Sequence, residues 1–345
     1  MISSVLTEFG FRENDYHFSP YGNGLINSTW LIERNENDEK FVLQKINHTV
    51  FRSPGDIAFN ISLIADHLKQ HHPEYLFIAP LKTTGGEELL NFNGEYFRLF
   101  PFVPGSYTID TVQQPAQAYE AASQFGKFTK LLSGLEINRL KISLPDFHNL
   151  SLRYLQFENV LITGDKLRLK QSRDMISFIQ QHRNIAGELE YYKPEFITRC
   201  THHDTKISNV LFDVNDKGIC VIDLDTVMPG YFISDVGDMM RTYLSPVNEE
   251  EKDFSAIGIR PAFYKAIVDG YMAEMGEEWT SHNSKIKDSH EIWFAVMGPG
   301  ILAKGEIKKP IQFYQKQFAQ TMASLLGLHF TCEHEVAEKI DLNRD

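Results

Sequence analysis

The chain has 345 residues, of which 42% are hydrophobic and 23% are charged, a composition typical of a globular protein with an ample core. Its formal net charge of −12 argues against a nucleic-acid or anionic-membrane partner, since no strong basic cluster offsets it. Three cysteines, Cys200, Cys220 and Cys332, lack metal-ligand spacing and leave an odd thiol, so we expect neither a disulfide framework nor structural zinc.

Missing sequence features argue against a secreted or membrane protein and against a hydrolase. The amino terminus lacks the basic start and apolar core of a signal peptide, and no apolar run approaches the length of a membrane span. We therefore expect a soluble, cytoplasmic protein. The sequence contains neither H-E-x-x-H nor the nucleophile motif G-x-S-x-G, which weakens hydrolase interpretations.

The first candidate functional segment in the sequence is a glycine-containing bend followed by a hairpin. Gly22 and Gly24 precede a strand near Trp30, residues 35–38 form a turn, and residues 41–46 return as a second strand. Small residues let backbone amides approach phosphate groups, so Gly22 and Gly24 are candidates to cover a nucleotide. An ordinary turn is the alternative, because G-x-G before a strand is a weak signal.

Lys45 occupies the position of the lysine in the kinase pattern V-A-I-K, from which an ammonium group could reach the α- and β-phosphates of a nucleotide. The alternative is a solvated lysine on an edge strand. Residues 54–70 predict a helix without a glutamate, so the acidic partner expected for such a lysine is missing there. Asp56, Asp66 or a residue outside this helix could replace it.

Residues 95–105 indicate a strand that enters a proline-punctuated connector. We predict that this connector forms a hinge at about residues 98–106. Adenine needs stacking surfaces together with main-chain hydrogen bonds, and Phe100 and Phe102 are candidates to supply the surfaces.

The hydrophobic periodicity changes near residue 104 and predicts two lobes. Residues 1–104 read as strands and turns with one helix, whereas residues 105–345 are mainly helical. Helices of the second lobe are predicted at residues 115–132, 152–160, 171–188, 260–273 and 312–327.

The densest functional pattern is T-H-H-D-T-K-I-S-N at residues 201–209. Asp204 and Asn209 stand five residues apart, the interval between the base and a magnesium ligand in the kinase catalytic loop. A hairpin over residues 210–222 would return Asp223 to the edge that carries Asn209. Each residue alone would be an ordinary turn residue, but the combination predicts a phosphoryl-transfer site.

The residue types of this segment indicate separate roles. We predict that Asp204 orients the acceptor hydroxyl or accepts its proton, and that Lys206 contacts the γ-phosphate. Carboxylate and amide oxygens suit Mg²⁺, so Asn209 and Asp223 are predicted metal ligands. Asp225 is either a further ligand or a residue that fixes the following turn.

A predicted helix after residue 230 contributes three more polar side chains. Asp235 is expected to cap this helix, because aspartate is favoured at helix amino termini, and the same account is available for Asp238. Arg241 lies six residues beyond Asp235 and is a candidate to orient a polar substrate. His202 is predicted to support the backbone of the catalytic loop.

Three strings carry a resemblance to a known family: H-x-D-T-K-x-x-N-V-L-F-D at residues 202–213, V-I-D-L-D-T-V-M-P-G at 221–230 and D-V-G-D-M-M-R at 235–241. They resemble the aminoglycoside phosphotransferase and choline kinase superfamily and, more narrowly, the N-acetylhexosamine 1-kinases. The resemblance implies a protein-kinase-like fold, ATP and Mg²⁺ as cofactors, and transfer of phosphate to the anomeric hydroxyl of a free amino sugar.

We therefore expect an α+β, protein-kinase-like fold with a small mixed β lobe and a larger, mainly helical lobe. The partner should be a small hydroxylated molecule, and the sequence indicates no oligomeric state. Two alternatives remain open. The same fold could phosphorylate another alcohol, such as choline, homoserine or an aminoglycoside, or the chain could be an inactive pseudokinase, which only the missing acidic partner of Lys45 supports.

Overall fold

The computed structural model describes residues 1–275, apart from residues 23, 25, 38 and 250. The chain forms two compact units, Met1–Thr280 and Ser281–Asp345, and the second lies outside the described residues. Cys332 and the helix predicted at residues 312–327 therefore also lie outside them.

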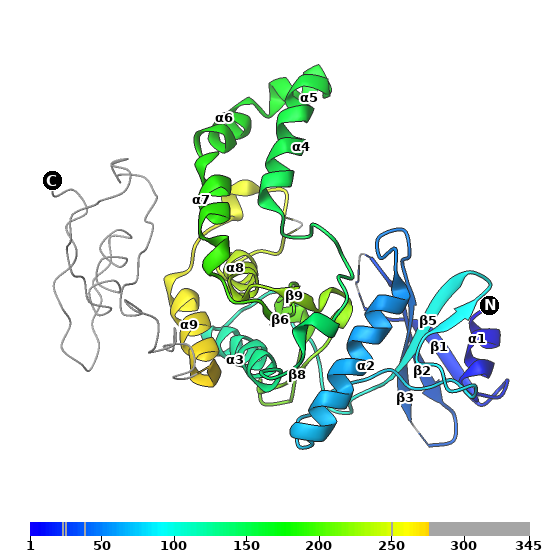
Figure 1. Ribbon diagram of the computed structural model, residues 1–345. Helices are drawn as coiled ribbons and strands as arrows, with labels where there is room; N and C mark the ends of the chain where they lie inside the picture. The colour runs from blue at the N-terminus through cyan, green and yellow to red at the C-terminus, as the bar shows by residue number, and fades with distance from the viewer. Residues whose placement is uncertain (23, 25, 38, 250, 276–345) are drawn as a thin grey trace. The chain divides into compact units, whose positions relative to one another are not determined.

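A five-stranded antiparallel sheet, in the order β1-β2-β3-β5-β4, forms the amino-terminal part of the chain (Figure 1). The predicted hairpin is confirmed, because β2 and β3 pair with Glu33 opposite Lys40. The elements of this part are α1 (Ile2–Glu8), β1 (Tyr16–Pro20), β2 (Ser28–Arg34), β3 (Lys40–Ile46), α2 (Pro54–His71), β4 (Leu90–Phe92) and β5 (Glu95–Pro101).

The two faces of this sheet pack against different parts of the chain. Successive side chains of a strand alternate between faces, and directly opposed residues of two strands share a face. Leu43 and its partner Leu99 form a buried cluster with α1. Gln44 and its partner Arg98 lie on the other face, together with Ile46, which belongs to the core cluster of the helical part.

Helix α2 belongs to the same core cluster as the helical part. Asn60 of α2 is fully buried, and its amide nitrogen donates to the carbonyl oxygens of Lys141 at 2.8 Å and Val227 at 3.0 Å. Its amide oxygen accepts a hydrogen bond from the Lys141 N–H at 2.8 Å. Two of these bonds fix α2 to the segment before α4, and the third fixes it to Val227, which follows β8.

The connector after β5 joins the sheet to the helical part. The N–H of Phe102 donates to the carbonyl of Lys40 at 3.0 Å, and Tyr107 exchanges two backbone hydrogen bonds, of 3.0 and 2.8 Å, with Phe212. The lobe boundary predicted near residue 104 falls in this connector, and the extents of the two lobes stay a prediction.

The remaining described chain is mainly helical, with two small two-stranded sheets that pair β6 with β9 and β7 with β8. Its helices are α3 (Pro115–Leu131), α4 (Leu150–Thr163), α5 (Lys166–Gln171), α6 (Arg173–Gln181), α7 (Asn184–Tyr192), α8 (Phe232–Tyr243) and α9 (Pro261–Met275). Its strands are β6 (Arg199–Thr201), β7 (Val210–Phe212), β8 (Gly218–Val221) and β9 (Met228–Gly230). Short 3₁₀ turns are η1 (Ile137–Arg139), η2 (Lys193–Glu195), η3 (Ile207–Asn209), η4 (Leu224–Thr226) and η5 (Phe254–Ala256).

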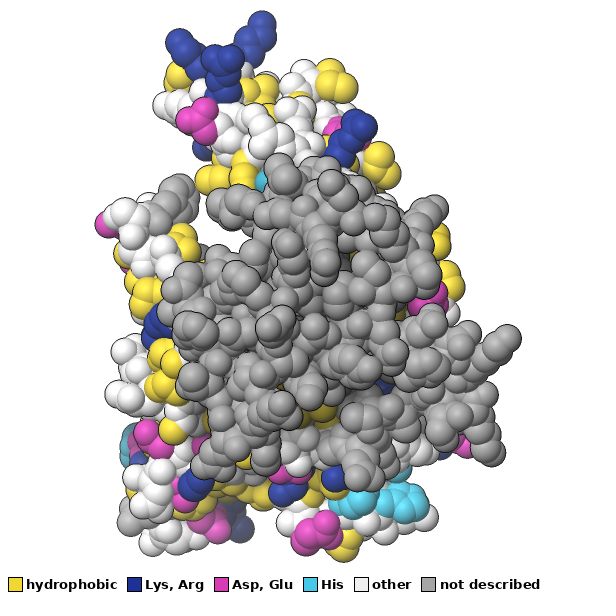
Figure 2. All heavy atoms as spheres, turned by 90° about the vertical axis from the view of Figure 1, so that its left-hand side faces the viewer, with side chains coloured by type: hydrophobic (Ala, Val, Ile, Leu, Met, Phe, Trp, Pro, Cys, Tyr) yellow, Lys and Arg dark blue, Asp and Glu magenta, His cyan; other side chains and the backbone are white. Residues whose placement is uncertain are grey.

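The helical stretches predicted for the described residues of this part are confirmed, and the stretch predicted at residues 171–188 is divided into α6 and α7. The ring of His182, where α6 ends, donates to the carbonyl of Phe178 at 2.8 Å. Helices α4 to α7 stand together, with α5 at their tip (Figure 1). Lysine and arginine side chains gather at that tip (Figure 2).

Helices α3 and α9 pack closely at two glycines. A Cβ atom on Gly126 would lie 2.8 Å from the carbonyl oxygen of Tyr271, and one on Gly270 would overlap the carbonyl of Tyr119. The two helix backbones therefore approach more closely than larger residues would allow.

We predict that Gly270→Ala destabilises the protein by about 1–3 kcal/mol, because the added methyl group overpacks the contact between α3 and α9. Gly187→Ala in α7 is the matched control, since a Cβ there meets no atom within 4 Å. That control should stabilise the protein by about 0.5–1 kcal/mol through helix propensity. Urea unfolding measures both changes, and equal effects would contradict the close packing.

Candidate active site

Asp235 of α8 holds the backbone of the catalytic loop, residues 202–206. Its two carboxylate oxygens accept hydrogen bonds from the N–H groups of His202 at 3.0 Å and His203 at 2.7 Å. Burial raises the pKa of Asp235 to about 7, while these two N–H groups oppose the rise. The predicted capping role is wrong, because the carboxylate turns to the loop and no side chain caps the start of α8.

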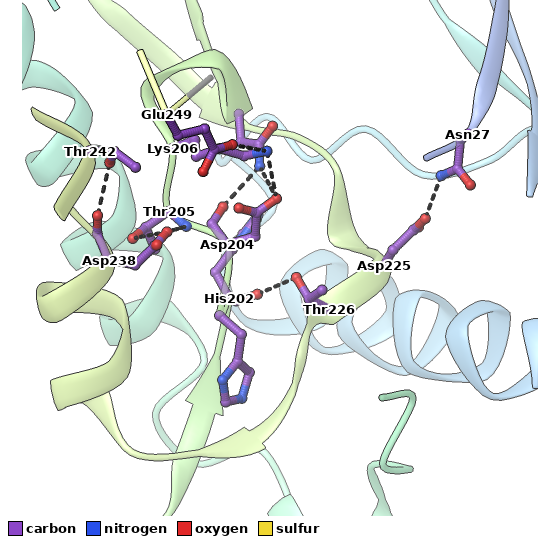
Figure 3. A network of polar contacts seen from close by, with 12 residues as sticks. Asn27, His202, Asp204, Thr205, Lys206, Asp225, Thr226, Asp238, Thr242 and Glu249 are labelled. Atoms are coloured by element: carbon purple, nitrogen blue, oxygen red, sulfur yellow. Dashed lines mark hydrogen bonds and ion pairs between the residues drawn. The ribbon is translucent and has the colours of Figure 1, made fainter. Parts of the chain in front are cut away.

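Thr205 is held by the same helix. Its N–H donates to Asp238 at 2.7 Å (Figure 3). Its hydroxyl donates to the carbonyl of Asp235 at 2.7 Å, and its carbonyl accepts from the hydroxyl of Tyr243 at 2.7 Å. Asp235, Asp238 and Tyr243 therefore immobilise the loop on both sides of Asp204.

His202 links the catalytic loop to the segment after β8. Its fully buried ring donates to the carbonyl of Ile222 at 3.0 Å, and its own carbonyl accepts from the hydroxyl of Thr226 at 2.6 Å (Figure 3). The ring also packs edge-on against Phe125. These contacts agree with the supporting role expected from the sequence.

The predicted hairpin is confirmed and returns Asp223 to the edge that carries Asn209. Strands β7 and β8 pair with Val210 opposite Val221, and the N–H of Ile222 donates to the carbonyl of Asn209 at 2.9 Å. Asp223 has a left-handed backbone with φ of 60°, a conformation that aspartate tolerates better than most residues.

Asp204 is half-buried between two donors. Its Oδ2 atom lies 3.4 Å from Nζ of Lys206 and 3.1 Å from Nδ2 of Asn209 (Figure 3). The same amide nitrogen donates to the Asp204 carbonyl at 2.8 Å. Because the nitrogen of Asn209 faces the loop, its amide oxygen is left as the atom that a cation can use.

Asp223 is crowded by other charges. Its side chain is open to solvent, yet the protein around it removes enough hydration to raise its pKa to about 7. The carboxylates of Asp225 and Asp204 add to this rise, while Arg98 and Lys206 oppose it. A cation at this position would relieve the crowding.

Glu249 extends the charge network, and the sequence analysis missed it. Its carboxylate lies 3.7 Å from Nζ of Lys206 and accepts a 2.7 Å hydrogen bond from Arg241, which also pairs with Asp238. Although burial lowers the pKa of Lys206, the carboxylates of Asp204 and Glu249 raise it above its usual value. Lys206 is therefore a cation beside Asp204. The acidic run at residues 249–251 was the only signal in the sequence.

Asp225 is buried and lies between the sheet and the hairpin. Its Oδ2 atom accepts from the side chain of Asn27 at 2.7 Å (Figure 3). Its Oδ1 atom pairs with Arg98, and its carbonyl accepts from the Ser143 hydroxyl at 2.9 Å. Asn27 in turn accepts from the N–H of Asn47 at 3.0 Å. These contacts join Asp225 to the sheet, to the β1–β2 loop and to Ser143, and the two roles predicted for it stay predictions.

The glycine bend and the connector lie near each other. Gly22 has φ of 76°, in the left-handed region that favours glycine, and both glycines lie in the β1–β2 loop. The centroid of the Tyr21 ring lies 6.3 Å from the centroid of the Phe102 ring. Phe100 lies on the same sheet face as Arg98, because the two are two residues apart on β5.

Lys45 is not brought together with the other predicted site residues. It follows Gln44 on β3 and pairs with Phe97, so it lies on the face that α1 covers, opposite to Arg98. Its Nζ atom lies 2.9 Å from the carboxylate of Glu95. The acidic partner of Lys45 therefore comes from β5, outside the helix in which the sequence analysis first sought it.

Neither a membrane-spanning helix nor a metal-binding cluster is found in the described part of the chain. No described helix has the length and apolar character that crossing a membrane requires. The described residues also contain no group of three or more His, Cys, Asp or Glu side chains arranged to hold a metal.

The sheet, the helical part and the site on the hairpin define an α+β protein of the kinase-like fold. An aminoglycoside phosphotransferase from Alicyclobacillus acidocaldarius has the same fold, with 11% sequence identity and a TM-score of 0.55 over 80% of this chain and 79% of that chain. Residues 17–278 match the phosphotransferase enzyme family (APH), and the chain belongs to that family.

Two other solved structures are similar at lower scores. A spectinomycin phosphotransferase in complex with ADP and spectinomycin has 14% identity and a TM-score of 0.49, with 78% of each chain covered. A choline kinase from Cryptosporidium parvum has 16% identity and a TM-score of 0.48, with 79% of this chain and 78% of that chain covered.

His203 is a buried, uncharged neighbour of the site. Its ring lies 2.8 Å from the hydroxyl of Thr201 and stacks on the ring of His148 with centroids 5.1 Å apart. Burial lowers the pKa of His203 to about 3. Its backbone φ of 67° is left-handed.

We predict that His203 makes the protein less stable in acid. The unfolded chain protonates this histidine below pH ~6.5 but the native state does not, so its contribution is complete above that pH and is lost as the pH falls. His203→Asn is compatible with the left-handed backbone at this position. Between about pH 6.5 and 5, the variant should lose about 2 kcal/mol less unfolding free energy than the native protein. Urea unfolding at both pH values measures the difference, and an unchanged pH dependence would contradict it.

Proposed function

We propose that the protein is an ATP- and Mg²⁺-dependent kinase that transfers the γ-phosphate to a hydroxyl group of a small molecule. One observation carries this proposal: Asp204 and Lys206, on the loop that α8 holds, lie at the edge of the hairpin that carries Asn209 and Asp223. Membership of the phosphotransferase family supports it.

Asp204 would orient the acceptor hydroxyl and accept its proton. Its carboxylate is partly open to solvent, while the backbone on both sides of it is fixed. A raised pKa is unnecessary, because the acceptor loses its proton late when phosphoryl transfer has a loose transition state. Lys206 lies beside Asp204 as a cation and would stabilise the charge on the transferred group.

Asn209 and Asp223 would hold Mg²⁺. One amide oxygen and one carboxylate are hard ligands, and phosphate oxygens and water commonly complete such a site. The raised pKa of Asp223, which the loss of hydration to the surrounding protein and the neighbouring carboxylates cause, fits a position that a divalent cation neutralises. When bound, Mg²⁺ neutralises charge on the phosphate groups.

The nucleotide would lie between the glycine bend and the connector. The backbone at Gly22 and Gly24 would cover the phosphates, and Phe100 and Phe102 would contact adenine. The contact between the rings of Tyr21 and Phe102 supports this position, because it brings the bend next to the connector. A relative bound to ADP supports the use of a nucleotide.

The proposed acceptor is an N-acetylhexosamine, phosphorylated at its anomeric hydroxyl. The strings at residues 202–213, 221–230 and 235–241 support this choice. Arg241 and Glu249 lie next to Lys206 and give this side of the site a polar, hydrogen-bonding character. Such a surface suits a hydroxylated sugar better than a quaternary ammonium group, which aromatic cages recognise.

Another alcohol and an inactive pseudokinase are the remaining candidates. The pseudokinase interpretation depended on a missing acidic partner for Lys45, but Lys45 pairs with Glu95 on the sheet face opposite Arg98, so this pair does not bear on catalysis. Asp204, Asn209 and Asp223 also remain as candidates for catalysis. We therefore favour an active enzyme.

The test is ADP release from ATP and Mg²⁺ with a panel of acceptors: N-acetylglucosamine, N-acetylgalactosamine, simple hexoses, choline, homoserine and an aminoglycoside. Activity on an amino sugar is expected. Activity on another alcohol alone would retain the reaction and overturn the acceptor, and nucleotide binding without any turnover would favour the pseudokinase.

We predict that Asp204→Asn lowers kcat by about 10²–10⁴-fold, because general-base positioning is lost, and changes ADP affinity by less than about twofold. Asp174→Asn on the exposed face of α6 is the matched control and should have no effect on either quantity. Steady-state kinetics and calorimetric ADP titration measure the two quantities. Full activity of Asp204→Asn would exclude the assigned role.

A further inference from the structure

Arg98 is a buried cation on the sheet face that meets the catalytic hairpin. Only 2% of the surface of Arg98 is exposed to solvent. Its guanidinium donates two hydrogen bonds, of 3.1 and 2.9 Å, to the side-chain oxygen of Gln44 and forms an ion pair with Asp225. Buried guanidinium groups require such partners, because burial removes their hydration.

One nitrogen of this guanidinium has no partner. Nη1 of Arg98 is buried and makes no hydrogen bond within the described part of the chain. Buried polar atoms are nearly always paired, so an orphaned donor on a cation indicates a missing anionic ligand.

The surroundings of Arg98 match those of a phosphate-binding cation. Asp225 pairs with it, and Asn27 reaches the other oxygen of Asp225 from the loop that contains Gly22 and Gly24. The kinase site requires a cation that contacts the nucleotide phosphates and is held by an acidic partner. Lys45 lies on the opposite face of the sheet and already pairs with Glu95.

We propose that Arg98, in place of Lys45, is the residue that contacts the α- and β-phosphates of the nucleotide, with Asp225 as its acidic partner and Gln44 as the residue that orients it. This inference rests on the proposed nucleotide site. It accounts for the absence of glutamate from residues 54–70, because the acidic partner follows the hairpin instead.

Calorimetric titration with Mg²⁺–ADP and with adenosine tests the proposal. Arg98→Met should weaken ADP binding at least about tenfold, the usual range for a lost charge-assisted contact, and leave adenosine binding within about twofold. Lys45→Met removes a cation from the same pair of strands and is the matched control. It should change neither affinity more than about twofold.

Arg98→Met leaves the buried carboxylate of Asp225 without its cation and could impair folding. The double variant Arg98→Met with Asp225→Asn removes both charges and should show the same selective loss of ADP binding. Thermal unfolding identifies folded variants.

Weaker ADP binding by Lys45→Met with unchanged binding by the Arg98 variants would overturn the inference and leave the proposed function intact. Equal losses of ADP and adenosine binding would also overturn it, because they indicate a structural role. A native protein that binds no nucleotide would overturn both proposals.

Discussion

The ion pair between Arg98 and Asp225 joins the sheet to the segment that carries Asp223. Both residues are buried, and each charge would be costly to bury without the other. Asn27 adds a hydrogen bond from the β1–β2 loop to the same carboxylate. The side chain of Asp225 therefore contacts both the β1–β2 loop and the sheet.

A second set of contacts positions the catalytic loop. Asp235, Asp238 and Tyr243 of α8 bind backbone groups of residues 202–205, so the loop conformation depends on a helix that follows it in the sequence. Asp204 stands between these anchored residues with its carboxylate partly open to solvent. A rigid backbone beneath an accessible carboxylate is what positioning of an acceptor hydroxyl requires.

The charges around Asp204 are arranged to bind anions and a cation together. Lys206, Arg241 and Arg98 supply positive charge, and Asp204, Asp223 and Glu249 supply negative charge within the same network. Because Lys206 pairs with two carboxylates, it stays protonated. Lys206 therefore places a positive charge next to the carboxylate of Asp204.

The sequence by itself determined the hairpin, the pairing of its two ends and the separation of Asp204 from Asn209, because these features depend on residues close together in the chain. Only the tertiary structure decided which strand residue faces the site. Lys45 and Gln44 are neighbours on β3, and strand periodicity cannot tell which of the two faces α1 and which faces Asp225. The partners of Arg98 and Asp225, and the contacts of Asp235 with the loop, likewise join segments that are distant in the sequence, and no local pattern encodes such contacts.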